Sequence, residues 1–517
     1  MPERSNKGSF IIYLVIFVGI LLRLAFLSNY PLGLNSDEAR IGYRATLLST
    51  TGKDETGRRL PLYFSSFTGY QLPLPSYLVA ASFLLFPPSV IAIRLPFALI
   101  GCLGLISFYG LSKRLLNSRG VLWATLAFAL SPGAIFLSRT ISSWMLYTNL
   151  ILIISFIGAK PWRRKHHLLV KFLSFFLVAF AIFLIIGYLL LPGAIRDIKD
   201  QGLGAPFDSS ISTNINQMRG EEIEYGIPAL GKLFFNKSYL FWTLAGSTFE
   251  NLNLRLFFAS GDQNPLHGPD DFGPLSFLLL PLFIIGSVRF LKSNFSQRKK
   301  FILITIFLLS LLPSILDKES PNQEKLMFSI PLIAFIIGWG ASRLSSKISF
   351  IYLLLFFLIL LPIGYISFTK PSPQSQNAWH TAVPQLAKSL KWKIPEYDKV
   401  YLSDSYAPDV GSDLAFLWQV PLEPVPFSAH SWIDHLGNVS IGNWPTWSVG
   451  PSEKVLFVLT PQEEKILNKF AVTKNKDGQV QKTCYQKLSE IKDPLGTIQF
   501  ILSSNTADGC SYVFHEI

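Results

Sequence analysis

Long apolar runs constrain this chain more than any other feature of its sequence. A helix needs roughly 20 mostly apolar residues to cross the hydrocarbon core of a bilayer. Nine runs reach or approach this length: residues 11–27, 95–111, 121–137, 144–158, 168–191, 275–288, 301–316, 327–340 and 348–368. The sequence therefore predicts an α-helical polytopic membrane protein with about nine spans.

The composition agrees with this class and excludes several others. Charged residues make up 15% of the chain and hydrophobic residues 50%, with a mean hydropathy of +0.36. Disordered, collagen-like and disulfide-scaffold proteins are excluded by these values. The net charge of +13 would indicate nucleic-acid binding only if the basic residues gathered on a soluble face.

The basic residues instead gather in alternate connections between the apolar runs. Five segments hold 17 Lys and Arg but a single acid, Glu3: residues 1–8, 112–120, 159–171, 289–300 and 343–347. Cytoplasmic loops of membrane proteins carry such an excess of cations. We therefore expect a cytoplasmic N-terminus, an extracytoplasmic segment after residue 368 and no nucleic-acid partner. Residues 11–27 are expected to remain as a span, because no small-residue cleavage site follows them.

Residues 72–86 form a tenth apolar run that does not fit the pattern. The run is short for a span and is flanked by prolines at Pro73, Pro75, Pro87 and Pro88. If it crossed the membrane, every later basic segment would lie outside. We predict an interfacial or re-entrant helix on the outer side, next to the membrane.

The C-terminal residues 370–517 have a different composition and lack a spanning run. Short buried strands are predicted at residues 399–402 and 454–459, and a helix start at Thr460-Pro461-Gln462-Glu463. This alternation predicts an extracytoplasmic α/β domain after a transmembrane domain at residues 1–369. Cys484 and Cys510 lie in it, and a disulfide between them is only slightly favoured over two free thiols. The third cysteine, Cys102, lies inside a predicted span.

The first outer loop, residues 29–73, carries an acidic pair directly after the first span. Asp37 or Glu38 is a candidate general base for an acceptor hydroxyl. The alternative is a solvated helix start, in which the helix dipole favours both acids and Arg40 pairs locally. Spacing alone favours the helix start.

Four cations at the outer ends of predicted spans form a second candidate group: Arg23, Arg94, Arg139 and Lys325. Singly, each is typical of a side chain that extends to the membrane surface. Together, at one depth and beside an acidic loop, they indicate a site for a lipid-linked phosphate.

Weaker candidates lie elsewhere on the outer side. The large outer loop, residues 192–273, contains Asp262, His267, Asp270 and Asp271, which are able to recruit a divalent cation. A loop punctuated by Pro and Gly is the preferred interpretation, so no metal or other cofactor is firmly implied. In the C-terminal domain, core packing is preferred over sugar stacking for five further residues: His430, Trp432, His435, Trp444 and Trp447.

Several segments, taken in order, resemble GT-C glycosyltransferases over roughly residues 9–345. They are SDEARIGYRA, LPLPSYLVA, IRLPFALIGCLGLISFYGLSKRLL, ALSPGAIFLSR and EKLMFSIPLIAF. The closest branches look like protein O-mannosyltransferases and the aminoarabinose transferase that modifies lipid A.

The resemblance implies an integral enzyme of the bacterial cytoplasmic membrane. It would transfer a hexosyl or pentosyl unit from a polyprenyl-phosphate donor to a protein, lipid or glycan acceptor, with inversion at the sugar carbon. Asp37 would be the base with Glu38 in support, and Arg139 and Lys325 would bind the donor phosphate. The helix at residues 72–86 would match the family's outer juxtamembrane helix.

Two departures from the family pattern stand out. Relatives usually carry a second acid four or five residues after the arginine matching Arg139, where this chain has Ser143 and Trp144. Relatives also often place Lys before the proline at residue 73, where this chain has Tyr70-Gln71-Leu72. A non-catalytic scaffold or sugar-lipid binder of the same fold is therefore the alternative. A transporter is disfavoured, because charges are nearly absent from the middle of the spans.

Overall fold

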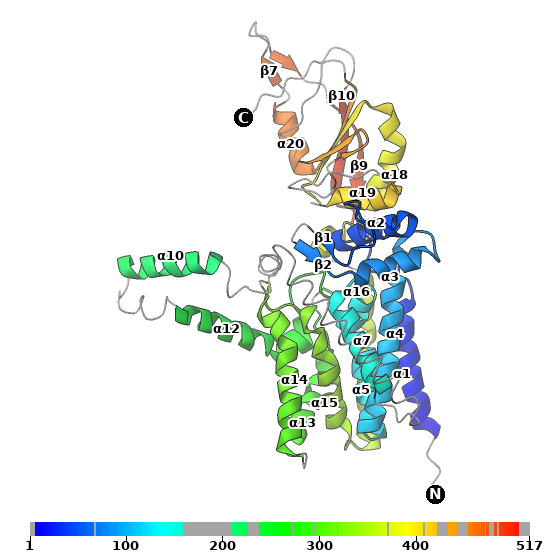
Figure 1. Ribbon diagram of the computed structural model, residues 1–517, viewed down its shortest axis with the longest axis vertical. Helices are drawn as coiled ribbons and strands as arrows, with labels where there is room; N and C mark the ends of the chain where they lie inside the picture. The colour runs from blue at the N-terminus through cyan, green and yellow to red at the C-terminus, as the bar shows by residue number, and fades with distance from the viewer. Residues whose placement is uncertain are drawn as a thin grey trace. The chain divides into compact units, whose positions relative to one another are not determined.

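The computed structural model describes residues 6–66, 69–158, 209–225, 237–270, 272–293, 296–317, 319–369, 372–406, 409–420, 433, 435–442, 453–470, 472–474, 480–482 and 485–505. Two compact units are present. A helical unit comprises Met1–Ala25, Tyr63–Leu72 and Leu95–Thr369, and a mixed unit comprises Phe26–Leu62, Pro73–Arg94 and Lys370–Ile517. Figure 1 shows the helices and strands of each.

Most of the helical unit consists of α-helices. Two of them, at Ser209–Tyr225 and Lys237–Asn251, lie in the predicted large outer loop, and the others coincide with the predicted runs. The helices are α1 (Asn6–Leu24), α4 (Val90–Leu115, from Leu95 onward), α5 (Ser118–Ala129), α6 (Pro132–Ser138), α7 (Ser143–Gly158), α10 (Ser209–Tyr225), α12 (Lys237–Asn251), α13 (Leu280–Leu291), α14 (Gln297–Ile315), α15 (Ile330–Ala341) and α16 (Ser346–Thr369). Short helices η2 (Leu256–Ser260), η3 (Phe277–Leu279) and η4 (Lys325–Phe328) and strands β1 (Phe64–Ser66) and β2 (Gly69–Gln71) join them. Eight of the nine predicted runs are thus helical, and the ninth, residues 168–191, lies outside the described residues.

Length and apolar composition identify fewer spans than the sequence pattern does. Among the described helices, α4 alone meets both requirements, and the pair α5 and α6 meets them when counted as one helix bent by 52°. The helical character of the unit is confirmed, whereas nine spans stay a prediction.

The bend between α5 and α6 follows from the local sequence. Pro132 begins α6, and the side chain of Ser131 caps it by accepting a hydrogen bond from Ala134 N. The last carbonyls of α5 are left without helical partners. Arg23 of α1, which is fully buried, donates to the carbonyls of Phe128 at 3.2 Å and Ala129 at 2.8 Å. The cation therefore stabilises the carboxyl end of α5.

Glycines bring α13 and α15 close together. A Cβ atom on Gly286 would lie 2.0 Å from the carbonyl oxygen of Ile336, and one on Gly340 would lie 2.1 Å from that of Leu282. Small residues at helix crossings are typical of membrane bundles, where backbones pack directly.

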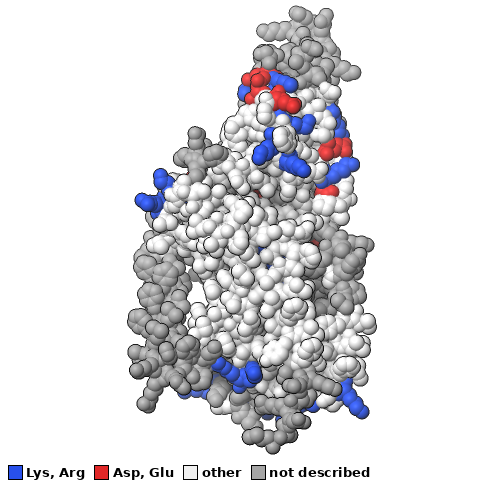
Figure 2. Space-filling view, turned by 90° about the vertical axis from the view of Figure 1, so that its right-hand side faces the viewer, with Lys and Arg blue, Asp and Glu red and all other residues white. Residues whose placement is uncertain are grey.

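Basic segments meet at one end of the helical unit. Where α5 begins and α15 ends, Asn117 donates to the carbonyl of Ser342 at 2.9 Å, and Arg119 donates to the hydroxyl of Ser346 at 2.8 Å. Figure 2 shows Lys and Arg at the lower edge of the helical surface, below a broad area without charged side chains. The segments 112–120 and 343–347, which the charge pattern assigned to one side, thus lie together.

The C-terminal part of the mixed unit is an α/β structure. Its six-stranded sheet has the order β4-β5-β3-β6-β10-β9, with β3 parallel to β5 and β6 and the other pairs antiparallel. The strands are β3 (Lys399–Ser403), β4 (His435–Leu436), β5 (Val439–Gly442), β6 (Val455–Leu459), β9 (Tyr485–Lys492) and β10 (Ile498–Asn505), besides the hairpin β7 (Val472–Lys474) and β8 (Val480–Lys482). The helices are α17 (Pro373–Ala378), α18 (Val383–Lys393), η5 (Ile394–Glu396), α19 (Val410–Trp418) and α20 (Pro461–Phe470).

Two strands and one helix start were predicted here and are confirmed. The predicted strands correspond to β3 and β6. At the start of α20, Thr460 N donates to the Glu463 carboxylate at 2.8 Å and Glu463 N donates to Thr460 Oγ1 at 3.4 Å. This reciprocal pair is a capping box.

The mixed unit also contains the first loop. Helix α2 (Ser36–Thr51) packs on α3 (Leu74–Phe83) and on α19. Gly33 has φ +80°, and a Cβ atom there would lie 2.0 Å from the carbonyl oxygen of Trp379. The C-terminal residues thus share one compact unit with the first loop, an association that the predicted boundary after residue 369 did not include.

Helix α3 occupies the run that was predicted not to cross. It has 10 residues and so is about 15 Å long, half the thickness of a hydrocarbon core. Pro75 lies in its first turn, and one side, including Val79 and Phe83, is buried. The length is consistent with a helix that does not span a membrane.

Candidate functional site

The acidic pair lies in the first turn of α2. Asn35 caps the helix, and its side chain accepts a hydrogen bond from Glu38 N at 2.8 Å. Asp37 and Glu38 follow where the helix dipole favours negative charge. The predicted helix start is therefore present, and the two acids differ in their surroundings.

Glu38 is held by Arg94 in a fully buried ion pair. Both side chains are 0% exposed, and Arg94 Nη2 lies 2.6 Å from Glu38 Oε2. Arg94 also donates to the carbonyls of Leu27, Pro31 and Gly33, each at 2.8 Å, and its Nε donates to Glu38 at 3.0 Å.

These contacts use all five N–H groups of the Arg94 guanidinium. The arginine therefore fixes the chain entering α2 and offers no donor to a phosphate in this arrangement. Glu38 is likewise enclosed. The geometry favours a structural role for both residues over the phosphate-binding and supporting roles expected from the sequence.

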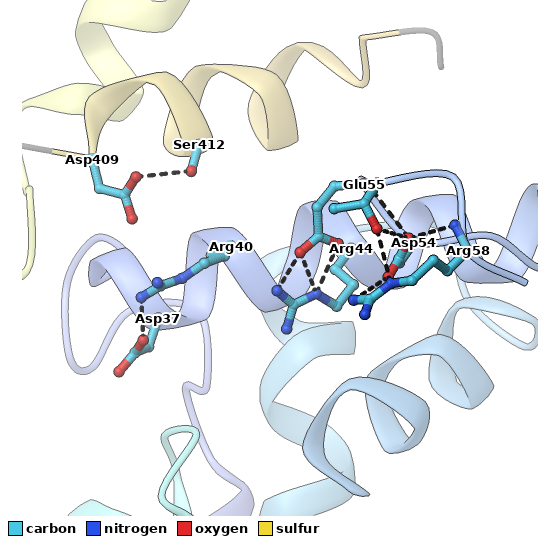
Figure 3. Close-up of polar contacts among 9 residues, drawn as sticks. Asp37, Arg40, Arg44, Asp54, Glu55, Arg58, Asp409 and Ser412 are labelled. Atoms are coloured by element: carbon cyan, nitrogen blue, oxygen red, sulfur yellow. Dashed lines mark hydrogen bonds and ion pairs between the residues drawn. The ribbon is translucent and has the colours of Figure 1, made fainter. Parts of the chain in front are cut away.

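Asp37 points to solvent. Its side chain is 59% exposed, and Arg40 Nη2 lies 2.5 Å from its Oδ1 (Figure 3). The other acids of the first loop, Glu38, Asp54 and Glu55, are all buried. Asp37 is thus the one acid of this loop whose carboxylate is open to solvent.

The two remaining acids stabilise the loop that follows α2. Glu55 forms a buried ion pair with Arg44. Asp54 accepts hydrogen bonds from the backbone N–H groups of Thr56 at 3.0 Å and Arg58 at 2.8 Å, and pairs with the Arg58 side chain. Because of these contacts, the carboxylates of Asp54 and Glu55 are buried although they lie in a loop.

Asp409, at the start of α19, faces the same end of α2 (Figure 3). It is 9% exposed and accepts a hydrogen bond from Ser412 at 3.0 Å. Burial raises the pKa of Asp409, Arg40 lowers it, and Asp413 and Asp37 raise it further. Sequence reasoning missed this residue, because nothing in the sequence links α19 to the first loop.

Arg23 and Arg139 lie near each other in the helical unit, around the end of α1. Arg139 caps the carboxyl end of α6, is 1% exposed, and donates to the carbonyl of Leu22 at 2.5 Å. Arg23 donates to the end of α5, as described above. For Arg23 this placement favours helix packing over the expected phosphate binding.

Lys325 begins the short helix η4. Its Nζ lies 2.8 Å from Asp317 Oδ2, and the same carboxylate accepts from the Asn322 side chain at 2.6 Å. The Lys325 side chain is 14% exposed. The cation is thus held in a defined position at one end of α14.

Glu324 supplies a carboxylate beside the segment that follows Arg139. Ser142 Oγ donates to Glu324 Oε1 at 2.7 Å. At the positions where an acid was absent from the sequence, Ser143 begins α7 and Trp144 packs edge-on against Phe328 at 5.6 Å. Nothing in the sequence pairs Glu324 with residue 142.

Asp262 and His267 contact each other in the large outer loop. His267 Nδ1 lies 2.7 Å from Asp262 Oδ2, which also accepts from Gln323 N at 2.7 Å. Burial lowers the pKa of His267, but the hydrogen bond and charge of Asp262, with the charges of Glu324 and Glu319, raise it overall. The pair ties this loop to residue 323. Across the described ranges, no three His, Cys, Asp or Glu side chains are grouped to hold a metal ion.

The remaining residues that the sequence analysis named are placed only in part. Tyr70 and Gln71 lie in β2, paired with Ser65 and Phe64 of β1. Cys484 and Cys510 lie outside the described residues, as do His430, Trp432, Trp444, Trp447 and Asp271. His435 lies in β4, paired with Ser440.

The described chain forms a bundle of helices that is interrupted by a structured first loop and followed by an α/β sheet. The apo structure of ArnT from Cupriavidus metallidurans is similar to this chain with a TM-score of 0.52 and 12% identity, covering 98% of this chain and 100% of that one. The resemblance to GT-C glycosyltransferases is thereby confirmed at the level of the fold.

Two further solved structures are similar. ArnT from the same organism bound to undecaprenyl phosphate gives a TM-score of 0.45 at 12% identity, covering 99% of this chain and 100% of that one. The oligosaccharyltransferase AglB from Archaeoglobus fulgidus, in complex with an inhibitory peptide and a dolichol-phosphate, gives 0.41 at 11%, covering 93% and 74%. No family model and no curated protein matches the sequence.

Proposed function

We propose that this protein is a membrane glycosyltransferase that uses a polyprenyl-phosphate-linked sugar. The acceptor is a protein, lipid or glycan on the outer face of the cytoplasmic membrane, and the N-terminus lies in the cytoplasm. The fold shared with ArnT along both chains supports the class of enzyme. The excess of cations in alternate connections supports the orientation.

One observation carries the proposal: Asp37 is the exposed carboxylate of a first loop whose other acids are buried in ion pairs or hydrogen bonds. A general base must reach the proton that it removes, so an exposed carboxylate in a fixed helical turn meets the first requirement. The Arg40 contact holds the carboxylate in one position. Neither Glu38 nor Glu55 meets this requirement.

The proposed reaction is a single displacement. The acceptor oxygen attacks the anomeric carbon of the sugar while Asp37 takes the hydroxyl proton. The bond between that carbon and the phosphate oxygen breaks, and the electron pair leaves with the polyprenyl phosphate. One displacement inverts the configuration at the anomeric carbon.

For the donor phosphate we retain Arg139 and Lys325. Cations stabilise the charge that develops on a leaving phosphate. Lys325 is held by Asp317 on one side, and the carboxylate of Glu324 lies next along the chain beside Ser142. Arg23, Arg94 and Glu38 are assigned to the fold instead.

An alternative function is binding of the sugar lipid without transfer. The observation that favours it is Trp144, which packs on Phe328 close to where relatives carry a second acid. A protein that keeps the phosphate ligands but lacks one carboxylate would bind the donor and turn it over slowly or not at all.

Transfer of a labelled sugar by the full chain in proteoliposomes tests both functions. Asp37→Asn should lower the rate by about 10²- to 10⁴-fold, the usual contribution of a general base. Glu396→Gln, which neutralises another exposed acid of the mixed unit, is the matched control and should leave the rate unchanged. Equal rates for wild type and Asp37→Asn would remove Asp37 as the base. Donor binding without transfer by the wild type would establish the alternative.

A further inference from the structure

The turn that leads into η4 is held by two carboxylates that lie outside it. The turn comprises residues 322–325. On one side, Asn322 Nδ2 donates to Asp317 Oδ2 at 2.6 Å, just after α14. On the other side, Gln323 N donates to Asp262 Oδ2 at 2.7 Å, in the large outer loop 61 positions earlier. Two neighbouring residues of the turn are therefore fixed by separate parts of the helical unit.

The side chain of Gln323 is enclosed as closely as its backbone, since the residue is 1% exposed. A Cβ atom on Gly268 would lie 2.3 Å from Gln323 Nε2, and one on Gly261 would lie 2.2 Å from Gln323 Oε1. A Cβ atom on Gly133 of α6 would lie 3.1 Å from Nε2. The space left by three glycines thus holds the amide, between the large outer loop and the start of α6.

The Asp262 carboxylate that accepts from Gln323 is itself fixed on both oxygens. His267 Nδ1 lies 2.7 Å from Oδ2, and Asn264 N donates to Oδ1 at 3.3 Å. The side chains of His267 and Asp262 are 10% and 7% exposed. The large outer loop therefore presents a carboxylate of defined orientation to the backbone of the turn.

The same turn carries a cation at its last residue. Lys325 Nζ lies 2.8 Å from Asp317 Oδ2, and Lys325 N donates to Asn322 Oδ1 at 3.2 Å. Lys325 follows Gln323 by two residues in a turn that is closed by this backbone contact. A displacement of Gln323 N consequently displaces the lysine as well.

We propose that Asp262 is a positioning residue for the donor, which holds Gln323 N and thereby places Lys325 where it meets the phosphate of the lipid-linked sugar. The proposal rests on the proposed function, in which Lys325 binds that phosphate. Asp262 itself does not contact the donor, because a carboxylate repels a phosphate. The acid acts through the turn alone.

The physical reason is the cost of a buried donor without an acceptor. Without the Asp262 carboxylate, Gln323 N loses its hydrogen bond in a place that solvent hardly reaches. The backbone of the turn then shifts until this N–H group finds another acceptor, and Lys325 shifts with it. A displaced cation loses part of its attraction for the phosphate.

The first test follows the turn and needs neither sugar nor transfer activity. Hydrogen exchange of the Gln323 amide is measured in peptides that cover residues 319–328, after exchange in the purified full chain. Asp262→Ala should raise the exchange rate about tenfold to a hundredfold, the effect of a lost hydrogen bond to a charged group. Glu250→Gln, at an exposed acid near the end of α12, is the matched control and should leave the rate unchanged. An unchanged rate in Asp262→Ala would overturn the proposal.

The second test is the Kd of the full chain for a polyprenyl phosphate without sugar. Asp262→Ala should raise the Kd about threefold to tenfold, and Asp262→Asn, which keeps an acceptor oxygen, should raise it less. In the Lys325→Gln background, Asp262→Ala should have no further effect, because it acts through that lysine. A purely structural role would lower the amount of folded protein but leave the Kd of the folded fraction unchanged.

The outcomes separate this proposal from the proposed function. If Lys325→Gln weakens binding and Asp262→Ala does not, positioning by Asp262 is overturned while the proposed function stands. Additive effects of the two substitutions would also overturn it, since Asp262 would then act independently of the lysine. If the coupling is found but no sugar is transferred, the proposed enzyme is wrong and the positioning role holds for a sugar-lipid binder. A wild type that does not bind the polyprenyl phosphate would overturn both.

Discussion

Glu38 and Arg94, 56 positions apart, form an ion pair from which solvent is excluded, with 2.6 Å between Nη2 and Oε2. The acid adjacent to the proposed base is therefore a structural element. Two neighbouring carboxylates in one helical turn have separate tasks, because one faces solvent and the other faces a buried arginine.

Removing one partner of this pair should lower the free energy of unfolding of the mixed unit. Glu38→Gln leaves the Arg94 charge buried without a counter-ion, and we expect a loss of about 3 to 5 kcal/mol in the free energy of unfolding. The double variant Glu38→Gln, Arg94→Met should lose less than Glu38→Gln alone. Chemical denaturation of the purified chain measures both, and a loss below about 1 kcal/mol for the single variant would contradict a buried pair.

Substitution of Lys325 should raise the KM for the sugar donor more than the KM for the acceptor. Lys325→Gln removes a cation proposed to bind phosphate, and we expect the KM for the polyprenyl-phosphate sugar to rise about tenfold, the effect of a lost charged hydrogen bond. Lys292→Gln, at an exposed lysine after α13, is the control.

The Lys325 substitution also leaves Asp317 buried beside a neutral side chain. The companion variant Lys325→Gln, Asp317→Asn should regain stability but not affinity for the donor. An unchanged KM in both variants would assign Lys325 to folding alone.

The close approach of α13 and α15 should make position 286 intolerant of any side chain. Gly286→Ala places a methyl group against the carbonyl of Ile336 and should cost about 1 to 3 kcal/mol through forced backbone shifts. Gly246→Ala, in α12 with no atom within 4 Å of the added Cβ, is the matched control. It should be neutral or gain about 0.5 to 1 kcal/mol from helix propensity. Equal midpoints in thermal unfolding would refute the close contact.

The His267–Asp262 pair predicts a stability that falls as pH rises. The pKa of His267 is raised in the folded state, so protonation stabilises the fold fully below the unfolded value of about 6.5 and is lost as pH passes the folded value. Unfolding midpoints between pH 5.5 and 8.5 should therefore decline more steeply for wild type than for His267→Gln. Parallel curves would show that the histidine is neutral in the fold.

Local features of the fold were predictable because they depend on neighbours in the sequence. Eight apolar runs correctly predicted helical segments, and the spacing of Thr460 and Glu463 predicted a helix start. The shortness of α3 was evident from charge counts and prolines.

Partners at long range were not predictable, because hydropathy carries no information on them. Arg23, Arg94 and Arg139 looked equivalent at the ends of apolar runs. Their hydrogen-bond partners distinguish them. Arg94 donates to Glu38 and to three backbone carbonyls, whereas Arg23 donates to carbonyls at the end of α5. The pairing of Ser142 with Glu324 and of α2 with α19 likewise joins segments that no periodicity relates.

The interleaving of the two compact units limits how such a protein is recombined. The chain passes from one unit to the other after residues 25, 62, 72, 94 and 369. A domain exchange with a single junction near residue 370 would transfer the C-terminal sheet. It would leave behind α2, α3 and Arg94, which belong to the same compact unit. Exchange between relatives should succeed only when residues 26–62 and 73–94 travel with the C-terminal segment, so the three segments are inherited as one block.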